Sequence, residues 1–314
     1  MAQRKGFLAS IKKKYAKKSR AAHRHALKGT HELMVIGFVF VAAIIISSFF
    51  VATTLQQHTR SRNESKFGVT FSIKQAQALG LDWREVYLAS LNELGVKYFR
   101  IPVYWDRVEF NRDIYEFEEI DFIVDEAARN DAKLILAIGQ RVPRWPECHT
   151  PAWAAELNEG VRHEQILELL TEIVNRYKDR EQVIMWQVEN EPLLDFFGEC
   201  PKGDVKFLAR EVEHVKNLDR SREVMVTDAG ELSFWLRTSS VADVLGVSLY
   251  RITWNPIFGN FFYPLTPQHY QQKAAFSEYF VNKVIISELQ AEPWGNSPLN
   301  QMSLEEQYKT MNMS

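Results

Sequence analysis

A regular alternation of short apolar runs with amphipathic segments begins at Phe67 and constrains the fold more than any other feature of the chain. The apolar runs have the length of buried strands, and the segments between them carry apolar residues at helical spacing. Strands that alternate with helices indicate a parallel sheet, because parallel strands need a long crossover between them. Seven consecutive units favour a barrel over an open sheet.

The predicted elements follow one another with short loops between them. We expect strands at 67–71, 98–103, 133–138, 183–188, 223–227, 244–249 and 284–287, and helices at 82–94, 120–129, 164–177, 205–215, 232–239 and 268–281. The run 133–138 is almost entirely apolar, which is typical of a strand covered on both faces. The fold class that follows is α/β, a TIM (β/α)8-type barrel over residues 67–314.

The end of the chain does not complete this pattern. A full barrel has eight units in about 250 residues. After Ser287 the sequence offers only a loop and one helix start at 303–306, whose Ser-Leu-Glu-Glu has the form of a capping box. We therefore expect a barrel without an eighth strand and interpret the chain as truncated. Such a barrel leaves two strand edges unpaired.

The region before the barrel divides into three parts. Residues 1–30 hold ten Lys or Arg and no Asp or Glu, and 33–55 is a run of 23 residues without a charge. About 20 apolar residues span a bilayer, whereas a cleaved signal has an apolar region of roughly 7–15 residues. We predict a basic cytoplasmic arm at 1–30, a transmembrane anchor at 31–55 and a linker at 56–66.

The charge distribution predicts orientation and partners. Positive residues beside a transmembrane helix remain in the cytoplasm, so residues 56–314 are expected outside it, in a single-pass membrane protein whose 33–55 segment has the lipid bilayer as its partner. A buried core helix is the alternative for that segment. Without the ten basic residues of the arm, the chain has 28 Lys or Arg against 40 Asp or Glu, which does not suggest binding to nucleic acid.

The two cysteines follow neighbouring predicted strands. Cys148 lies in the loop after the third strand and Cys200 in the loop after the fourth, and a parallel barrel places such loops side by side. Because an extracytoplasmic compartment permits disulfides, we expect a Cys148–Cys200 bond, with two free thiols as the alternative. The cysteines have few histidines nearby and no strand end supplies paired histidines, so no metal or other cofactor is predicted.

Acidic residues gather at the carboxyl ends of two predicted strands, the end of a parallel barrel at which active sites lie. Asn190 and Glu191 follow the fourth strand, and Glu288 follows the seventh. Glu189 and Glu292 are the rival carboxyl groups. Two acids at matched strand ends have the residue types that hydrolysis of a glycosidic bond requires.

Aromatic and amide side chains occur at the same strand ends. Flat apolar sugar faces stack well on aromatic rings, so Trp105, Trp145, Trp254 and Trp294 are candidate sugar subsites. The alternative for each is packing within its loop. Gln140, at the end of the third strand, is a further candidate for substrate binding.

These residues carry a resemblance to a group of enzymes. The segment 186–192, with its Asn-Glu-Pro, resembles the fourth-strand signature of clan A glycoside hydrolases, and Glu288 after Val-Ile-Ile-Ser resembles the seventh-strand nucleophile. Arg100 in Phe-Arg-Ile-Pro is similar to the second-strand arginine, and Tyr250 to the sixth-strand tyrosine. The resemblance covers about 67–294 and is nearest to family 5 (cellulase and mannanase-like) or family 42 (β-galactosidase-like) enzymes.

The resemblance implies a role for each matching residue. Glu191 would be the acid/base and Glu288 the nucleophile of a retaining mechanism, with Arg100 and Tyr250 holding Glu288 ionised and aimed. Asn190 would bond the sugar 2-hydroxyl. In an ideal strand Asn190 and Glu191 face opposite ways, so both enter the site only if the strand ends or bulges there.

The sequence departs from the family pattern at two places. Gly139-Gln140 stands where the third strand often carries a histidine, and the eighth strand with its tryptophan is absent.

The sequence is compatible with three functions. The first is a membrane-anchored, extracytoplasmic, retaining β-glycoside hydrolase acting on a poly- or oligosaccharide. The second is a catalytically inactive glycan-binding or cell-surface module with a degenerate barrel, and the third, disfavoured, is a metal-dependent barrel hydrolase. The sequence does not name the sugar, because loops decide specificity.

Overall fold

The computed structural model describes residues 41, 66–250, 252–255 and 259–289. The chain divides into two units, Met1–Glu64 and Ser65–Ser314, and the description below concerns the second. The predicted arm, anchor and linker lie outside the described residues, apart from Val41 and Lys66. Within the described ranges, no helix combines the length and the hydropathy that a membrane span needs.

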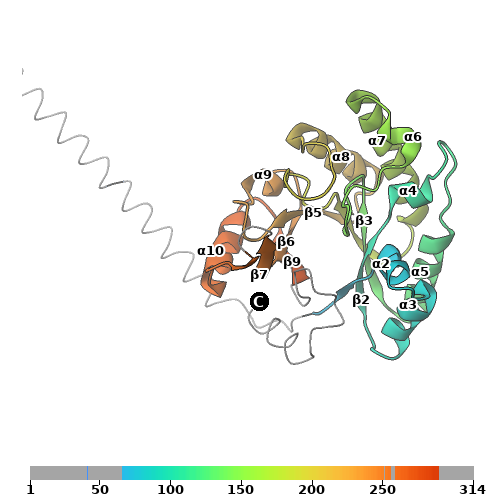
Figure 1. Ribbon diagram of the computed structural model, residues 1–314, viewed down its shortest axis with the longest axis horizontal. Helices are drawn as coiled ribbons and strands as arrows, with labels where there is room; N and C mark the ends of the chain where they lie inside the picture. The colour runs from blue at the N-terminus through green and yellow to red at the C-terminus, as the bar shows by residue number, and fades with distance from the viewer. Residues whose placement is uncertain (1–40, 42–65, 251, 256–258, 290–314) are drawn as a thin grey trace, which may run out of the picture. The chain divides into compact units, whose positions relative to one another are not determined.

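Seven parallel strands form one sheet, and their order in the sheet is their order along the chain (Figure 1). In order they are β1 (Val69–Thr70), β2 (Tyr98–Pro102), β3 (Lys133–Ile138), β4 (Val183–Val188), β5 (Glu223–Ala229), β6 (Val244–Leu249) and β9 (Lys283–Leu289). All seven predicted strands are found, with shifts of a few residues at the ends of β1, β5 and β9. The α/β class and the parallel sheet are therefore confirmed.

The sheet curls until distant strands meet. β2 is second in the sheet and β9 is last, yet a guanidinium nitrogen of Arg100 on β2 lies 2.6 Å from a carboxylate oxygen of Glu288 on β9. The fold is thus a nearly closed parallel barrel of the TIM type. Seven parallel strands belong to it within the part of the chain that the structure describes, and β1 and β9 are its outer strands.

Helices cover the outside of the sheet (Figure 1). They are α2 (Ile73–Ala78), α3 (Trp83–Asn92), α4 (Trp105–Val108), α5 (Glu118–Arg129), α6 (Ala152–Ala155), α7 (Glu159–Tyr177), α8 (Val205–Leu218), α9 (Leu236–Ser239) and α10 (Pro267–Ser277). Asp82 begins α3 by accepting hydrogen bonds from two backbone N–H groups of its first turn, as an N-cap does. The sequence did not predict α2, α4 and α6, which are too short to display helical periodicity.

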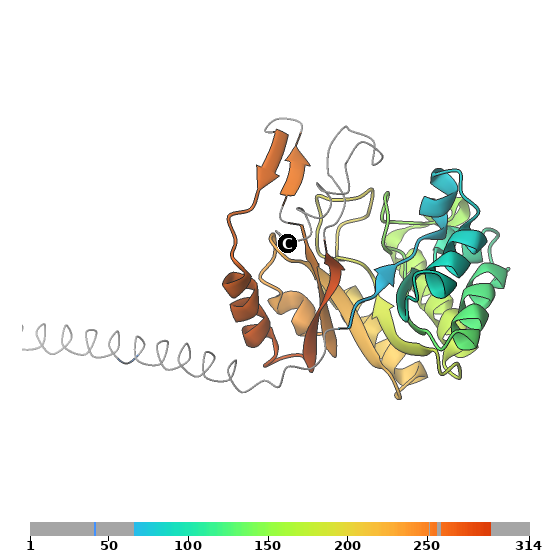
Figure 2. The same ribbon diagram turned by 90° about the horizontal axis from the view of Figure 1, so that it is seen from below.

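An antiparallel hairpin, also not predicted, lies between β6 and α10. Its strands are β7 (Ile252–Asn255) and β8 (Gly259–Phe262). Figure 2 shows it projecting beyond the end of the sheet. Four-residue strands are too short to distinguish from a loop by alternation alone.

Burial is greatest in the middle of the sheet. All six residues of β6 are buried, whereas both residues of β1 are exposed and β9 is only partly buried. The strands between β1 and β9 lie between the barrel interior and the helices, which accounts for their almost continuous apolar sequence.

Candidate active site

The turn after β4 brings two successive side chains to the mouth of the barrel. β4 ends at Val188, and both Glu189 (φ 57°) and Glu191 (φ 44°) adopt the left-handed backbone region. Residues other than glycine rarely do so, at a cost of about 1–3 kcal/mol each. Because the strand has ended, the side chains no longer alternate, and Asn190 and Glu191 both reach groups on neighbouring strands. The turn provides the strand end that the sequence required.

Arg100 connects the strands that build this site. Its guanidinium donates to Glu288 Oε1 on β9 and to Asn190 Oδ1 after β4, each at 2.6 Å. Its Nε also donates to Gln187 Oε1 at 2.6 Å. The side chain is 5% exposed, and a buried guanidinium is stable only when its donors are satisfied in this way. Arg100 therefore fixes the relative positions of β4 and β9 at their carboxyl ends.

Glu288 has a separate partner for each carboxylate oxygen. Arg100 binds Oε1, and the hydroxyl group of Tyr250 donates to Oε2 at 2.5 Å. The Glu288 side chain is 19% exposed, so it is held firmly but remains accessible. Hydrogen bonds from a cation and a phenol fix the direction of both carboxylate oxygens.

Glu191 has the opposite electrostatic environment. Burial, followed by the negative charge of Glu288, raises the pKa of the Glu191 carboxyl group to about 8, and Glu147 contributes in the same direction. Its backbone N–H donates to Thr227 Oγ1 at 2.8 Å, which anchors the turn to β5. A carboxyl group with this pKa is protonated at neutral pH and can donate a proton. The site thus pairs a proton donor with a bound carboxylate.

Three residues of the site were not singled out from the sequence. Gln187 and Thr227 both donate to Asn190 Oδ1, at 3.3 and 3.0 Å. Glu147 accepts a hydrogen bond from Asn190 Nδ2 at 2.9 Å. Gln187 and Thr227 could have been identified from the sequence, because both are polar residues inside strands that are otherwise apolar. Glu147 lies far along a loop, where no periodic pattern indicates its direction.

The loop after β3 and the loop after β4 are joined. Cys148 and Cys200 form a disulfide with a Cα–Cα distance of 5.3 Å. The rings of Trp145 and Phe197 also meet with centroids 5.9 Å apart, and the Glu199 N–H donates to the Pro146 carbonyl at 2.9 Å. The two loops therefore behave as one unit at the rim of the barrel.

The tryptophans predicted to stack on sugars differ in their exposure. Trp145 is 59% exposed on the joined loops and is available to a ligand. The interpretation of Trp105 was wrong, because its ring is fully buried at the start of α4, donates to Glu109 and packs edge-on against Trp153. The side chain of Trp254, as well as Trp294 and Glu292, lies outside the described residues.

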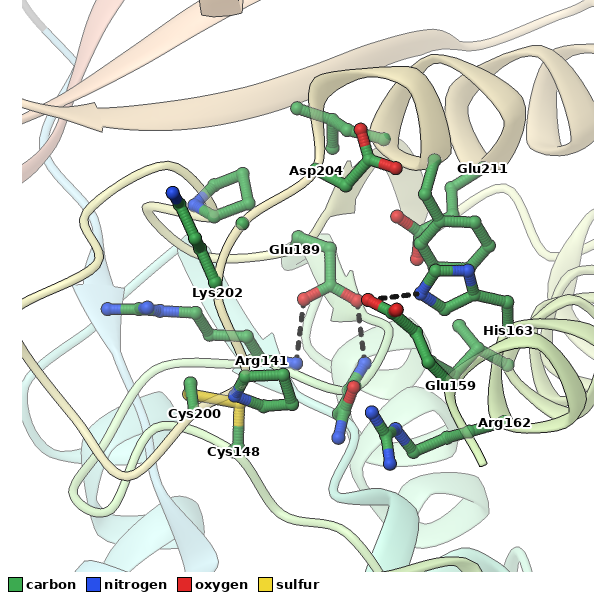
Figure 3. A pocket seen from close by; sticks show the side chains of 17 residues that line it. Arg141, Cys148, Glu159, Arg162, His163, Glu189, Cys200, Lys202, Asp204 and Glu211 are labelled. Carbon is green, nitrogen blue, oxygen red and sulfur yellow. Dashed lines mark hydrogen bonds and ion pairs between the residues drawn. A yellow bond between two sulfur atoms is a disulfide. The ribbon is translucent and has the colours of Figure 1, made fainter. Parts of the chain in front are cut away.

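Gln140 and Glu189 line a cavity beside the candidate site (Figure 3). The cavity has a volume of about 60 Å³ and is also bordered by the disulfide, His163 and Glu211, whereas Glu191 and Glu288 are not among its lining residues. Gln140 donates through its side chain to Thr150, at 2.6 Å. Its position supports the β3 loop and does not favour the predicted contact with substrate.

Glu189 holds the start of the β3 loop. Its two oxygens accept hydrogen bonds from the backbone N–H groups of Gln140 and Arg141 at 2.7 Å each, and the protonated carboxyl group of Glu211 on α8 donates a hydrogen bond to the same carboxylate. A Cβ at Gly139 (φ 123°) would overlap the Glu189 carboxylate, so this approach requires glycine. Glu189 is therefore a structural ligand of the backbone and not a rival for the acid/base position.

Solved structures with a similar fold are glycoside hydrolases of low sequence identity. A glycosylated family 10 endo-β-1,4-xylanase from Gloeophyllum trabeum has 13% identity and a TM-score of 0.52, over 72% of this chain and 71% of that one. A psychrophilic family 10 endo-β-1,4-xylanase has 15% identity and a TM-score of 0.51, over 79% of each chain. At this level of identity the likeness shows the fold alone.

A further structure, GH5_18 from Streptomyces cattleya in complex with GlcNAc, has 16% identity and a TM-score of 0.49 over 60% of this chain. The chain spans about half of the length of that protein, 52%. No curated protein sequence gives a significant match.

The model of one protein family matches the sequence directly. It is the cellulase model, glycosyl hydrolase family 5, and it matches residues 67–235, more than half of the chain. The match includes the Arg100 strand, the turn that carries Asn190 and Glu191, and both cysteine loops. The chain therefore belongs to glycosyl hydrolase family 5, the cellulase family.

Proposed function

We propose that the protein is a membrane-anchored, retaining β-glycoside hydrolase that acts on a poly- or oligosaccharide outside the cytoplasm. The observation that carries the proposal is the contrast between two carboxyl groups at the barrel mouth. Glu288 is bound by Arg100 and Tyr250, whereas the pKa of Glu191 is raised to about 8 by burial and by the charge of Glu288. Retaining hydrolysis requires one ionised nucleophile and one protonated acid.

In the first step Glu191 donates its proton to the glycosidic oxygen while a Glu288 oxygen attacks the anomeric carbon. The bond from that carbon to the leaving oxygen breaks, and a glycosyl ester forms on Glu288. The loss of negative charge at Glu288 lowers the pKa of Glu191, which is now ionised. Asn190, held by Arg100, is positioned to bond the sugar 2-hydroxyl.

In the second step a water molecule replaces the leaving group. The Glu191 carboxylate takes a proton from the water as its oxygen attacks the anomeric carbon. The ester bond to Glu288 breaks, which restores both carboxyl groups and releases a sugar with the original anomeric configuration. Tyr250 and Arg100 stabilise the departing carboxylate.

The proposed location rests on sequence features. The uncharged segment 33–55 follows ten basic residues, which supports a membrane anchor with its N-terminus in the cytoplasm. The Cys148–Cys200 disulfide supports an oxidising compartment for the barrel. The family's description as cellulase supports a β-linked glycan as substrate.

Hydrolysis of aryl β-glycosides and soluble β-glycans by the full-length protein tests the proposal. We expect product release by the wild type and by Glu199→Gln, an exposed control on the joined loops, but not by Glu288→Ala. NMR of the first product should show retained configuration at the anomeric carbon. Glycan binding without turnover would instead support the alternative, a non-catalytic glycan-binding module.

Membrane anchoring has its own measurement. After alkaline carbonate extraction of expressing cells, the full chain should stay in the membrane pellet. Recovery in the supernatant would contradict the anchor without affecting the enzymatic proposal.

A further inference from the structure

Asn190 is held at both ends of its side-chain amide. Its Oδ1 accepts hydrogen bonds from Arg100 at 2.6 Å, Thr227 at 3.0 Å and Gln187 at 3.3 Å. Its Nδ2 donates to Glu147 Oε2 at 2.9 Å. The proposed mechanism uses this amide to bond the sugar 2-hydroxyl, but it gives Glu147 no step of its own. The role of Glu147 is therefore separate from that of the two reacting carboxyl groups.

The partners of the Asn190 amide determine which way it faces. A guanidinium has donors only, so Arg100 must meet the amide oxygen. The Glu147 oxygen accepts, so it must meet the amide nitrogen. Because both N–H bonds lie in the plane of the amide, the proton donated to Glu147 sets the direction of the second proton. That second N–H is the donor that can bond a sugar hydroxyl.

The backbone holds Glu147 in place. Its own φ is 73°, its N–H donates to the Arg144 carbonyl at 2.7 Å, and the residue is only 5% exposed. A Cβ at Gly198 would lie 2.9 Å from the Glu147 Cβ, so the β4 loop approaches this side chain closely because residue 198 is glycine. The adjacent Cys148 is in the disulfide. The position of the carboxyl group is thus built by both loops.

The contact between Glu147 and Asn190 does not require a particular charge on the carboxyl group. Burial raises the pKa of Glu147, and the charge of Glu288 adds to this shift. The hydrogen bond from Asn190 and the positive charges of Arg141 and Arg100 oppose it. A carboxyl group has an acceptor oxygen in either protonation state. An amide at position 147 can therefore supply the same acceptor, whereas a methyl group cannot.

We propose that Glu147 is a positioning residue for the hydrolysis, which accepts one Nδ2 proton of Asn190 and thereby directs the other toward the sugar 2-hydroxyl. Hydrogen bonds to the 2-hydroxyl strengthen in the transition state, so the effect lies in kcat more than in binding. The kinetic consequence rests on the proposed function, but the fixed amide can be observed without turnover.

Hydrolysis of two substrates by the full-length protein tests the kinetic consequence. They are para-nitrophenyl β-cellobioside and its counterpart without the 2-hydroxyl on the sugar at the cleaved bond. Glu147→Ala should lower kcat for the first roughly ten- to a hundredfold, and for the second less than about threefold, because the second lacks the hydroxyl that Asn190 bonds. Glu147→Gln keeps an acceptor and should stay within a few-fold of the wild type on both, and Glu199→Gln should match the wild type.

NMR of the full-length protein with isotope-labelled asparagine tests the fixed amide directly. The side-chain signals of Asn190 are assigned through their loss in Asn190→Ala. In the wild type and in Glu147→Gln, one Nδ2 proton should resonate downfield and exchange slowly with water. In Glu147→Ala this proton should lose both properties. The wild-type spectrum needs no variant of Glu147 to fold.

Two results would overturn the inference. One is an equal effect of Glu147→Ala on both substrates, whether a loss or none, which would leave no link to the 2-hydroxyl. The other is a pair of rapidly exchanging Asn190 protons in the wild type. A wild type that hydrolyses neither substrate but shows the held amide would refute the proposed hydrolase and leave the positioning by Glu147 in place, so the two failures are distinguishable.

Discussion

Glu189 and Glu191 lie two positions apart at the end of β4, and each belongs to a different pair of carboxyl groups. Glu191 is close enough to Glu288 on β9 for their charges to interact. Glu189 accepts a hydrogen bond from the protonated carboxyl group of Glu211 on α8. Burial is the largest cause of the raised pKa in both Glu191 and Glu211. The two pairs share an electrostatic principle but not a function.

The partners of each pair make the difference. Glu288 has a cation and a phenol on its oxygens and is 19% exposed, whereas Glu189 has two backbone N–H groups and is 6% exposed. The first arrangement leaves a directed carboxylate accessible to substrate, and the second ties a helix and a loop to a strand end. A raised pKa marks a catalytic acid only when an accessible carboxyl group faces it across a site that a substrate can enter.

The largest expected effect is a difference in kcat between a variant of the Glu191–Glu288 pair and a variant of the Glu189–Glu211 pair. Glu288→Gln should lower kcat on the order of 10⁴-fold or more, as loss of a nucleophile does in other enzymes. Glu211→Gln should keep kcat within a few-fold, because the amide still donates to Glu189. Steady-state hydrolysis of an aryl β-glycoside measures both. Equal losses in the two variants would remove the distinction between the pairs.

The next effect concerns the proton on Glu191. With a pKa of about 8, the wild type should lose activity as pH rises through about 8, because the carboxyl group loses the proton it donates. Glu191→Gln should lower kcat by about 10²–10⁴-fold on unactivated glycosides and abolish this alkaline limb. Rate profiles from pH 5 to 10 provide the measurement. An unchanged limb in the variant would assign it to another group.

The joined loops after β3 and β4 give a third, smaller effect. Replacing both Cys148 and Cys200 with serine should lower the free energy of unfolding by about 2–4 kcal/mol, because the disulfide closes a long segment of chain. Urea unfolding measures the change, and wild type unfolded in the presence of reductant is the matched control. Identical midpoints with and without reductant would show that the other loop contacts suffice.

The smallest effect is the pH dependence of stability that arises from Glu211. The folded-state pKa of Glu211 lies well above its ordinary value of 4.5. The folded protein therefore keeps a proton that the unfolded chain loses, and this contribution is complete below pH 4.5 and declines as pH rises. Glu211→Gln supplies a permanent donor, so its Tm should exceed that of the wild type by about 2–4 °C at pH 9. A parallel decline of both Tm values with pH would contradict this account.

Much of the barrel could be predicted from local pattern. Each strand from β2 to β5 is an apolar run that follows a helix of clear periodicity, and such patterns depend only on neighbours along the chain. The motif residues Arg100, Tyr250 and Glu288 could be assigned to strand ends for the same reason, and the structure brings these three together. The hairpin β7–β8 was missed because its strands are too short to carry a period.

Side-chain direction in the loops could not be predicted. Trp105 and Trp145 both follow strand ends, yet one ring is sealed in the core and the other is largely exposed. Glu147 looked like an ordinary loop charge, and only the joined loops turn it toward Asn190. A loop residue has no periodic partner, so its environment depends on segments distant in sequence.

The amino-acid sequence by itself determined the order of the strands, the parallel sheet and the identity of the residues at its carboxyl ends, because these follow from apolar period and residue type. The tertiary structure alone decided which of those residues meet. The curl of the sheet brings Arg100 to Glu288, and the left-handed turn after β4 separates Glu189 from Glu191. Contacts of this kind arise from curvature and backbone strain summed over the whole barrel, which no local stretch of sequence specifies.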